Sequence, residues 1–154
     1  MSRWVDVETE APALAAAARR YLDAHTHKVI ATLRRDGSPR VSGTECIFAG
    51  GDLWFGSMWR ARKALDLLRD PRFSLHSGSD DAERWSGDAK VTGMVEEVTD
   101  PDRIEAVYPG AAPGPMHVFR ADVSEVVVVS LAPSKDRLVI EAWHAGRGLS
   151  RHER

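Results

Sequence analysis

The chain has 154 residues, 43% of them hydrophobic, and its 21 Lys and Arg residues nearly balance its 23 Asp and Glu residues. The length is that of one ordinary globular domain, and a formal net charge of −2 gives no overall field that attracts nucleic acid or an anionic membrane. The single cysteine, Cys46, excludes an internal disulfide, and no apolar run near the N-terminus is long enough for a signal peptide or a membrane span, so we expect a cytoplasmic protein.

The first third of the chain predicts one helix followed by three strands. The Ala-rich stretch 11–25 follows Thr9, a candidate helix cap, and has Pro12 in its first turn, which predicts a helix. Beyond it, apolar residues alternate with polar ones as in half-buried strands, and glycine-containing turns separate three such stretches. These strands are 28–34, 40–48 and 53–56. We expect them to form a meander.

The rest of the chain predicts two helices and four strands. Apolar residues at helical spacing predict a helix over 60–70 that stops before Pro71. Its expected buried face consists of Ala61, Ala64, Leu65 and Leu68. A short helix follows over 100–108, and polar or Gly- and Pro-rich loops are expected at 77–86 and 109–115. The remaining strands are predicted over 73–76, 89–98, 123–131 and 137–143, the last two joined by a turn at 133–136.

The pattern of strands and helices predicts the fold class. Strands joined in hairpins, with helices inserted singly, favour an antiparallel barrel over a parallel βαβ sheet. We therefore expect a single mainly β (α+β) domain over residues 1–154. It should be an antiparallel β-barrel of about six to seven strands with a few peripheral helices.

The most informative segment is 55–65, in which a strand ends, a turn of small residues follows and a helix begins. Arg60, Arg62 and Lys63 fall in or near the first helical turn, where the helix dipole disfavours each positive charge by about 0.3–1 kcal/mol. A bound anion removes this conflict. Ser57 can donate its hydroxyl, an arginine can hold two oxygens and Lys63 can add a point charge, which together make a phosphate cradle. The alternative is a solvated basic face, as most charge clusters are.

Four sequence motifs follow one another in a characteristic order. They are residues 29–41 with their Asp36-Gly37 turn, 51–55, 61–64 and 70–72. In this order they resemble the pyridoxamine 5'-phosphate oxidase-like flavoprotein family, strongly over the first half of the chain and loosely over the rest. The resemblance implies a split β-barrel, usually a homodimer, that holds FMN or the deazaflavin F420 across the subunit interface.

The resemblance also implies which residues bind the cofactor. Lys63 corresponds to the lysine that holds the cofactor phosphate, with Arg60, Arg62 and Ser57 as helpers. The flavin-type ring is then expected along one strand, and the turn beyond the third strand adds further contacts. These residues are Arg40, Val41, Ser42, Gly43 and Thr44 on the strand, and Met58 and Trp59 in the turn.

Two positions depart from the family pattern. Asp66 stands where deazaflavin-using members often carry Asn. Residues 136–147 lack the Arg-Leu-His-Asp-Arg type of segment that holds the substrate phosphate in true pyridoxamine-phosphate oxidases. The resemblance therefore indicates the cofactor more than the reaction, since one fold hosts many activities.

These observations predict an FMN- or F420-dependent oxidoreductase that acts on a small molecule. Hydride transfer belongs to such a cofactor, so no catalytic acid or base is required of the chain, and no catalytic residue is assigned. The alternative is a non-catalytic split barrel that binds a cofactor or haem. A nucleic-acid-binding barrel is disfavoured because the sequence lacks a basic surface with interleaved aromatic residues.

The remaining candidate residues have structural as well as functional interpretations. No pair among the six histidines has the i, i+4 spacing of a helical zinc site, so we expect no metal. His76, His117 and His144 lie near strand ends, where each can orient a substrate or serve the fold. Cys46 fits a small core side chain better than a nucleophile.

A homodimer is expected on physical grounds as well as from the resemblance. Half a cofactor groove and exposed barrel strands are features that a two-fold partner would cover. Trp59 and Trp85 lie in predicted loops, where they can pack on a cofactor ring or on the partner.

Overall fold

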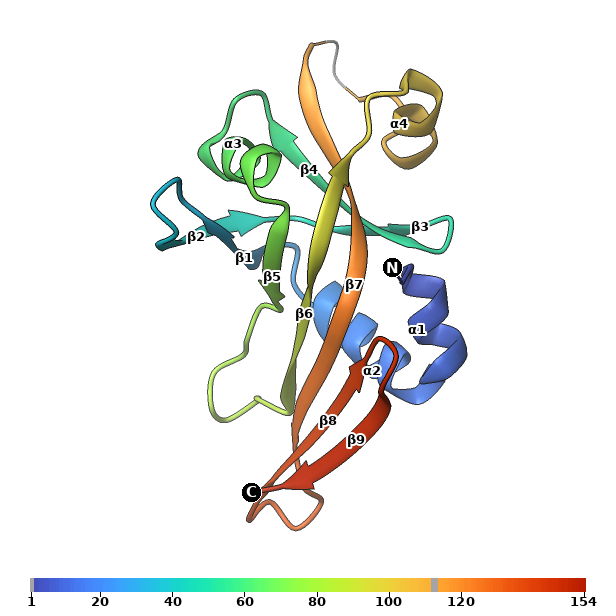
Figure 1. The fold of residues 1–154 in the computed structure, drawn as a ribbon. Coiled ribbons are helices and arrows are strands. Elements are labelled where there is room, and N and C mark those ends of the chain that lie inside the picture. The colour runs from blue at the N-terminus through green and yellow to red at the C-terminus, as the bar shows by residue number, and fades with distance from the viewer. Residues whose placement is uncertain (1, 112–113) are drawn as a thin grey trace.

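The computed structural model describes residues 2–111 and 114–154, and within them a single antiparallel sheet of nine strands forms the centre of the molecule (Figure 1). The strands are β1 (Lys28–Leu33), β2 (Pro39–Thr44), β3 (Ile47–Ala49), β4 (Asp52–Met58), β5 (Arg72–His76), β6 (Gly87–Glu97), β7 (Met116–Leu131), β8 (Leu138–His144) and β9 (Gly148–Glu153). The helices are α1 (Trp4–Glu10), α2 (Pro12–Asp23), α3 (Arg62–Arg69) and α4 (Pro101–Val107).

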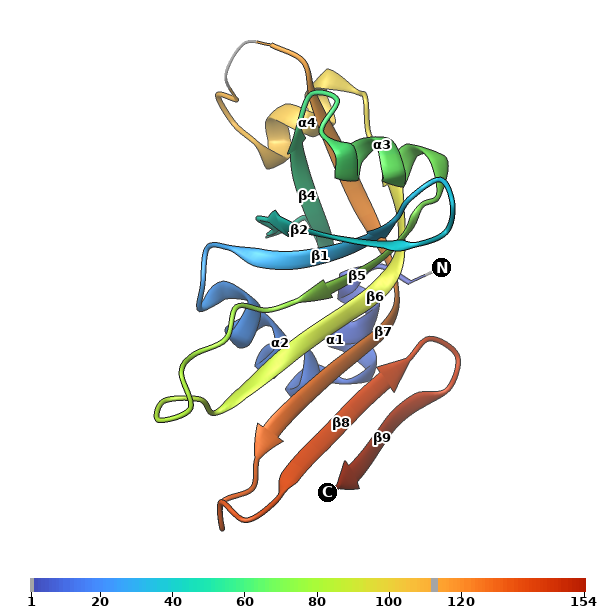
Figure 2. The ribbon, with the colours of Figure 1, turned by 90° about the vertical axis from the view of Figure 1, so that its left-hand side faces the viewer.

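The sheet is strongly curled. Its hydrogen-bonded order is β2-β1-β5-β6-β7-β4-β3, and β8 and β9 continue from β7. The curling brings β2, at one end of this order, into contact with β4 near the other end. Figure 2 shows α1 and α2 packed beside the long strands β6 and β7, while α3 lies across the opposite end near β1 and β2.

The core lies between the inner face of the sheet and the two N-terminal helices. Alternate residues of β6 and β7 point inward, as the two-residue period of a strand requires, and Leu14, Ala18 and Leu22 of α2 pack against them. The indole nitrogen of Trp143 donates to Glu10 over 2.8 Å, which joins β8 to the end of α1. The N-terminal helices therefore cover the side of the sheet that would otherwise expose its apolar residues.

The sequence misses α1 and misplaces the cap of the next helix. Thr9 lies inside α1, where its hydroxyl donates to the carbonyl of Val5, and Ala11 is the N-cap residue of α2. Only Trp4 and Val7 of α1 are buried, which is too short an apolar pattern to predict a helix.

The predicted meander is confirmed in its two hairpins, because β1 pairs with β2 and β3 pairs with β4, but its middle strand is broken. The expected strand 40–48 breaks at Glu45 and Cys46 into β2 and β3, and β4 pairs with β7 along its other edge. This additional pairing depends on the length of β7, whose 16 residues pair with β4 through the first part and with β8 through the last. The β7–β8 hairpin is as predicted, with Leu131 facing Leu138 across the turn.

The prediction misses one further strand, and one predicted loop lies partly outside the described residues. β9 was not predicted because its sequence has almost no apolar alternation and its residues are mostly exposed. The loop expected over 109–115 includes residues 112–113, which lie outside the described part of the chain. Across residues 2–111 and 114–154, every helix is too short or too polar to cross a bilayer.

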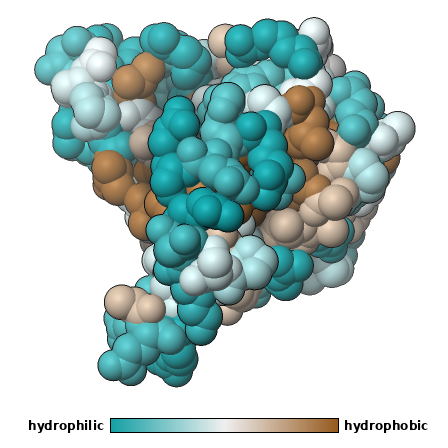
Figure 3. Space-filling view, turned by 90° about the horizontal axis from the view of Figure 1, so that it is seen from below, coloured by the Kyte–Doolittle hydropathy of each residue, from teal (hydrophilic) through white to brown (hydrophobic). Residues whose placement is uncertain are grey.

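Seen from below, the surface is mostly hydrophilic and its hydrophobic residues form separate groups (Figure 3). The outward face of the β1–β2 hairpin exposes two apolar side chains, Val29 at 43% and Val41 at 68%. Ala31 pairs with Val41 and Val29 pairs with Gly43, so these four residues share one face of the hairpin.

Gly93 provides a test of the fold at the bulge between β6 and β7. The register of the two strands shifts between Thr92 and Gly93, and a Cβ at Gly93 would collide with the carbonyl oxygen of Asp122. We expect Gly93→Ala to lower the free energy of unfolding by about 1–3 kcal/mol, because the two backbones must separate. Urea denaturation followed by tryptophan fluorescence measures this change.

The matched control is Gly43→Ala, where an added Cβ meets no atom within 4 Å. We expect that substitution to change stability by less than about 0.5 kcal/mol. Equal stability of the two variants would contradict the close approach of β6 and β7 at the bulge.

Candidate functional site

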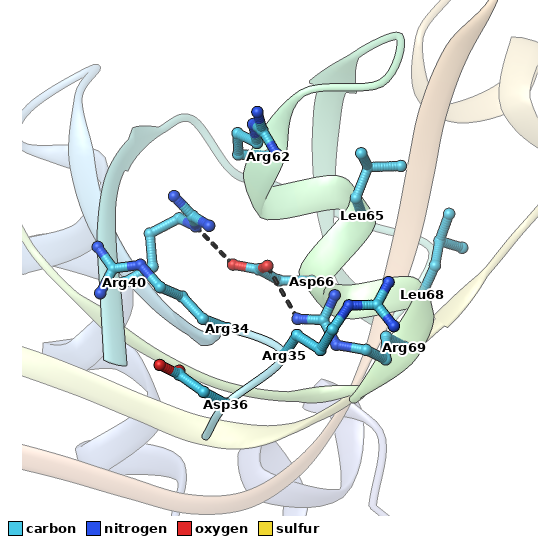
Figure 4. A pocket seen from close by; sticks show the side chains of 9 residues that line it. All are labelled: Arg34, Arg35, Asp36, Arg40, Arg62, Leu65, Asp66, Leu68 and Arg69. Carbon is cyan, nitrogen blue, oxygen red and sulfur yellow. Dashed lines mark hydrogen bonds and ion pairs between the residues drawn. The ribbon is translucent and has the colours of Figure 1, made fainter. Parts of the chain in front are cut away.

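A pocket of about 810 Å³ lies between α3 and the β1–β2 hairpin (Figure 4). Arginines dominate its wall, with two aspartates and two leucines among them. The lining residues are Arg34, Arg35, Asp36, Arg40, Arg62, Leu65, Asp66, Leu68 and Arg69. The sequence predicted Arg40 and Arg62 as site residues, and the structure brings both to this arginine pocket.

Asp66 is the buried charge that organises the arginine pocket. Its side chain accepts hydrogen bonds from Nε of Arg40 at 2.7 Å, from Oγ1 of Thr32 at 2.8 Å and from Nη2 of Arg69 at 3.0 Å. Asp66 is only 3% exposed, whereas Leu65 is 37% exposed. The predicted buried face is correct for Ala64, which is fully buried, and for Ala61, which packs against the core. It is wrong for Leu65 and Leu68, which stay outside because the helix turns Asp66 inward to these partners.

The environment of Asp66 keeps its carboxylate charged. Burial opposes ionisation, but the hydrogen bonds from Arg40, Thr32 and Arg69 outweigh it and hold the pKa of Asp66 below its usual range. The second acid of the pocket, Asp36, accepts bonds from the hydroxyl and the backbone N–H of Ser38, which likewise lower its pKa. Each carboxylate of the arginine pocket therefore already has a partner.

The arginines of the pocket are not all compensated in this way. Arg34 donates to the carbonyl of Pro39, and Arg40 and Arg69 share Asp66. Within residues 2–111 and 114–154, the side chains of Arg35 and Arg62 have no hydrogen-bond or ion-pair partner. The pocket thus carries excess positive charge and donors that suit an anion with several oxygens.

The start of α3 adds a second feature that favours an anion. Ala61 is the N-cap residue and supplies no side-chain acceptor for the first backbone N–H groups, and Arg62 and Lys63 occupy the first two helical positions. Lys63 donates from Nζ to the carbonyl of Gly43 on β2 over 2.7 Å. Partial burial lowers the pKa of Lys63, and the charge of Glu45 opposes that shift.

His117 holds the turn before α3. The sequence left two roles open for this residue, orienting a substrate or serving the fold. Arg60 has a left-handed backbone, with φ of 57°, and its N–H donates to Nε2 of His117 at 3.2 Å. The ring of Trp59 stacks on the imidazole of His117, with ring centres 4.5 Å apart. Nδ1 of His117 lies 2.7 Å from Oε1 of Glu97. Arg60 thus takes part through its backbone, and its side chain lines neither of the two cavities described here.

A second cavity, of about 850 Å³, lies beside this turn. The predicted residues Ser57, Met58 and Trp59 are among those that line it. The others are Asp23, Thr26, Lys28, Glu45, Cys46, Ile47, Gly56, Tyr108, Ala111, Gly114, Pro115 and Met116. We call it the tryptophan cavity.

Two titratable groups of the tryptophan cavity stay protonated at neutral pH. Burial raises the pKa of the Cys46 thiol to about 11 and that of the Tyr108 hydroxyl to about 12. A thiol that remains protonated is a poor nucleophile, which agrees with the structural interpretation of Cys46.

The edge strand β2 runs from the arginine pocket toward the tryptophan cavity. Arg40 lines the first, and Glu45, the residue after the end of β2, lines the second. Between them, Val41 is exposed, Ser42 is half-buried and Thr44 is buried. Apart from Arg60, whose side chain lines neither cavity, the predicted site residues line one of the two cavities or lie on β2 and at Lys63 between them.

Comparison with known proteins identifies similar families and folds. A family model for pyridoxamine 5'-phosphate oxidase matches residues 14–130. Among the curated proteins, none matches the chain.

Several solved structures share the fold. A pyridoxamine 5'-phosphate oxidase-related, FMN-binding protein from Nostoc punctiforme is 14% identical, with a TM-score of 0.62 over 94% of this chain and 96% of its own. A FAD-binding protein from Mesorhizobium loti is 22% identical, with a TM-score of 0.54 over 73% and 91% of the two chains. A haem-binding protein from Mycobacterium smegmatis is 16% identical, with a TM-score of 0.55 over 90% and 87%. The predicted fold class, a mainly β antiparallel split barrel with peripheral helices, is confirmed.

The compensation of Asp66 predicts a pH-dependent contribution to stability. We expect Asp66→Asn to lower the free energy of unfolding at pH 7 by about 1–3 kcal/mol, since Arg40 and Arg69 lose their counter-charge. Because the pKa is lower in the folded chain, this stabilisation is complete above the ordinary Asp pKa of about 3.9 and disappears as the pH falls through the folded value.

Urea denaturation of both proteins between pH 7 and pH 3 measures this dependence. The stability difference should be constant down to about pH 5 and shrink below about pH 3.9. Asp81→Asn, in an exposed loop, is the control and should show no such difference. A stability difference between wild type and Asp66→Asn that grows as the pH falls would contradict the lowered pKa of Asp66 in the folded chain.

Proposed function

The chain belongs to the pyridoxamine 5'-phosphate oxidase family, and on that premise we propose that it binds FMN and acts as a flavin-dependent oxidoreductase on a small molecule. The observation that carries this proposal is the arginine pocket at the uncapped start of α3, where Arg35 and Arg62 face a common space without a partner in the described residues. FMN binding by the Nostoc protein and FAD binding by the Mesorhizobium protein are consistent with it.

The residues of the arginine pocket fit a phosphate group. A guanidinium presents paired donors that match two phosphate oxygens, and the free N–H groups of a helix start favour negative charge. Arg62 and Lys63 supply both features at the first positions of α3, and Arg40 is held beside them by Asp66. We assign these three residues to the cofactor phosphate.

The flavin ring fits the strand that leads away from the phosphate site. We assign it to β2 between Arg40 and Thr44, with Ser57, Met58 and Trp59 at the far end, next to the tryptophan cavity. When bound, a flavin supplies the hydride-transfer chemistry. Cys46 and Tyr108 stay protonated and offer neither a thiolate nor a phenolate. We assign to this chain the positioning of the substrate and the exclusion of water around it.

We also propose that the protein is a homodimer. The outward face of the β1–β2 hairpin exposes Val29 and Val41, and β2 is an edge strand in the hydrogen-bonded order. A second copy would cover this apolar face and close the open side of the ring site. Sedimentation at micromolar concentration should give twice the 17.0 kDa mass of one chain, and a species of 17.0 kDa alone would contradict the dimer.

Comparison of FMN with riboflavin tests the phosphate assignment, since riboflavin lacks the phosphate. We expect wild-type protein to bind FMN more tightly than riboflavin in a fluorescence titration. Arg62→Ala combined with Lys63→Ala should weaken FMN binding by about 2–4 kcal/mol, because charge-assisted hydrogen bonds are lost, and should leave riboflavin binding unchanged. Arg147→Ala, in the β8–β9 turn, is the matched control for loss of an exposed arginine.

Parallel titrations with other ligands distinguish FMN from other cofactors and test the alternative of a non-catalytic binding protein. F420 is the second cofactor in the same assay, and tighter binding of F420 would replace FMN in the proposal. Haem is the third, because the Mycobacterium protein binds haem. Bound FMN that NAD(P)H never reduces would support a non-catalytic binding protein, and binding of none of these ligands would contradict the proposed function.

A further inference from the structure

We propose that His117, oriented by Glu97, is a positioning residue that fixes the turn before α3 and thereby sets the affinity for the cofactor phosphate. The inference rests on the proposed function, because it concerns the same phosphate site. It assigns a role to two residues of β6 and β7 that line neither the arginine pocket nor the tryptophan cavity.

The tautomer of His117 follows from its partners. The residue is 3% exposed, on β7, directly opposite Ser57 of β4. A carboxylate only accepts hydrogen bonds, so the contact of Nδ1 with Glu97 at 2.7 Å places the proton on Nδ1. Nε2 is then left as an acceptor, and the N–H of Arg60 occupies it at 3.2 Å.

The conformation of the turn explains why it needs such a support. Arg60 has a Cβ, yet its φ of 57° lies in the left-handed region that residues other than glycine adopt only where surrounding contacts hold them. The bond to His117 is such a contact. The imidazole also stacks on Trp59 at an interplanar angle of 8°, and the N–H of Ala61 donates to the carbonyl of Met58.

These contacts determine where α3 begins. Arg60 and Ala61 come directly before Arg62 and Lys63, so the path of the turn sets the direction in which the free N–H groups and both cations point. Both ring nitrogens of His117 are occupied by the protein, and Trp59 covers one face of its ring. His117 therefore acts through the turn rather than on a substrate, which decides between the two interpretations that the sequence left open.

Replacing His117 by two different residues tests its role. His117→Phe keeps a ring that can stack on Trp59 but removes both hydrogen bonds. His117→Gln keeps an acceptor for the N–H of Arg60 and a donor for Glu97. The dissociation constants of FMN and riboflavin are measured for each variant and for wild-type protein by fluorescence titration.

We expect His117→Phe to weaken FMN binding about tenfold and riboflavin binding less than about twofold. His117→Gln should stay within about threefold of wild type for FMN. Riboflavin binding also reports whether the buried substitution leaves the protein folded. Glu97→Ala, at a partly exposed position, frees the imidazole to move its proton to Nε2, and we expect it to weaken FMN binding in the same direction as His117→Phe.

Amide hydrogen exchange of the turn supplies a readout that needs no cofactor. The Arg60 N–H should exchange faster in His117→Phe and in Glu97→Ala than in wild type or His117→Gln. Unchanged selectivity for FMN over riboflavin in His117→Phe would overturn this inference and leave the proposed function standing. Wild-type protein that shows no preference for FMN would overturn the proposed function, and this inference with it.

Discussion

The carboxylate of Asp66 ties α3 to the sheet. It accepts hydrogen bonds from Thr32 on β1, from Arg40 on β2 and from Arg69 at the end of its own helix. Because a buried charge is tolerated only when its partners are in place, these bonds select the rotation of α3. That rotation leaves Leu65 and Leu68 at the surface and buries Asp66.

The same ion pairs explain the charge of the candidate site. Asp66 compensates Arg40 and Arg69, whereas Arg35 and Arg62 keep free guanidinium groups within the described residues. The start of α3 is held from its other side by the hydrogen bond between Arg60 and His117. A phosphate site needs donors that keep their places when no ligand is present, and one anchor within α3 together with one in the turn before it provides this preorganisation.

The sequence predicted the fold class, which the structure confirms, and it placed a candidate site at the start of α3, but it did not predict the contacts that build this region. Alternating strands, the turn into α3 and the cations of its first turn are local patterns, and the structure confirms those strands and the helix. Pairing between strands that lie far apart in the sequence is not a local pattern, so the pairing of β4 with β7 could not be predicted, and the polar β9 shows no apolar alternation. Asp66 meets Arg40 across 26 positions and Arg60 meets His117 across 57, separations that only the sheet register brings together.

The central claim is that the start of α3 and the arginine pocket hold a phosphate, and the ³¹P NMR spectrum of FMN in the presence of the protein tests it most directly. The account predicts that the phosphorus resonance shifts on binding and titrates at a lower pH than in free FMN, because the guanidinium groups favour the dianion. A resonance that keeps the position and titration of free FMN, while ring fluorescence reports binding, would show that the phosphate lies elsewhere.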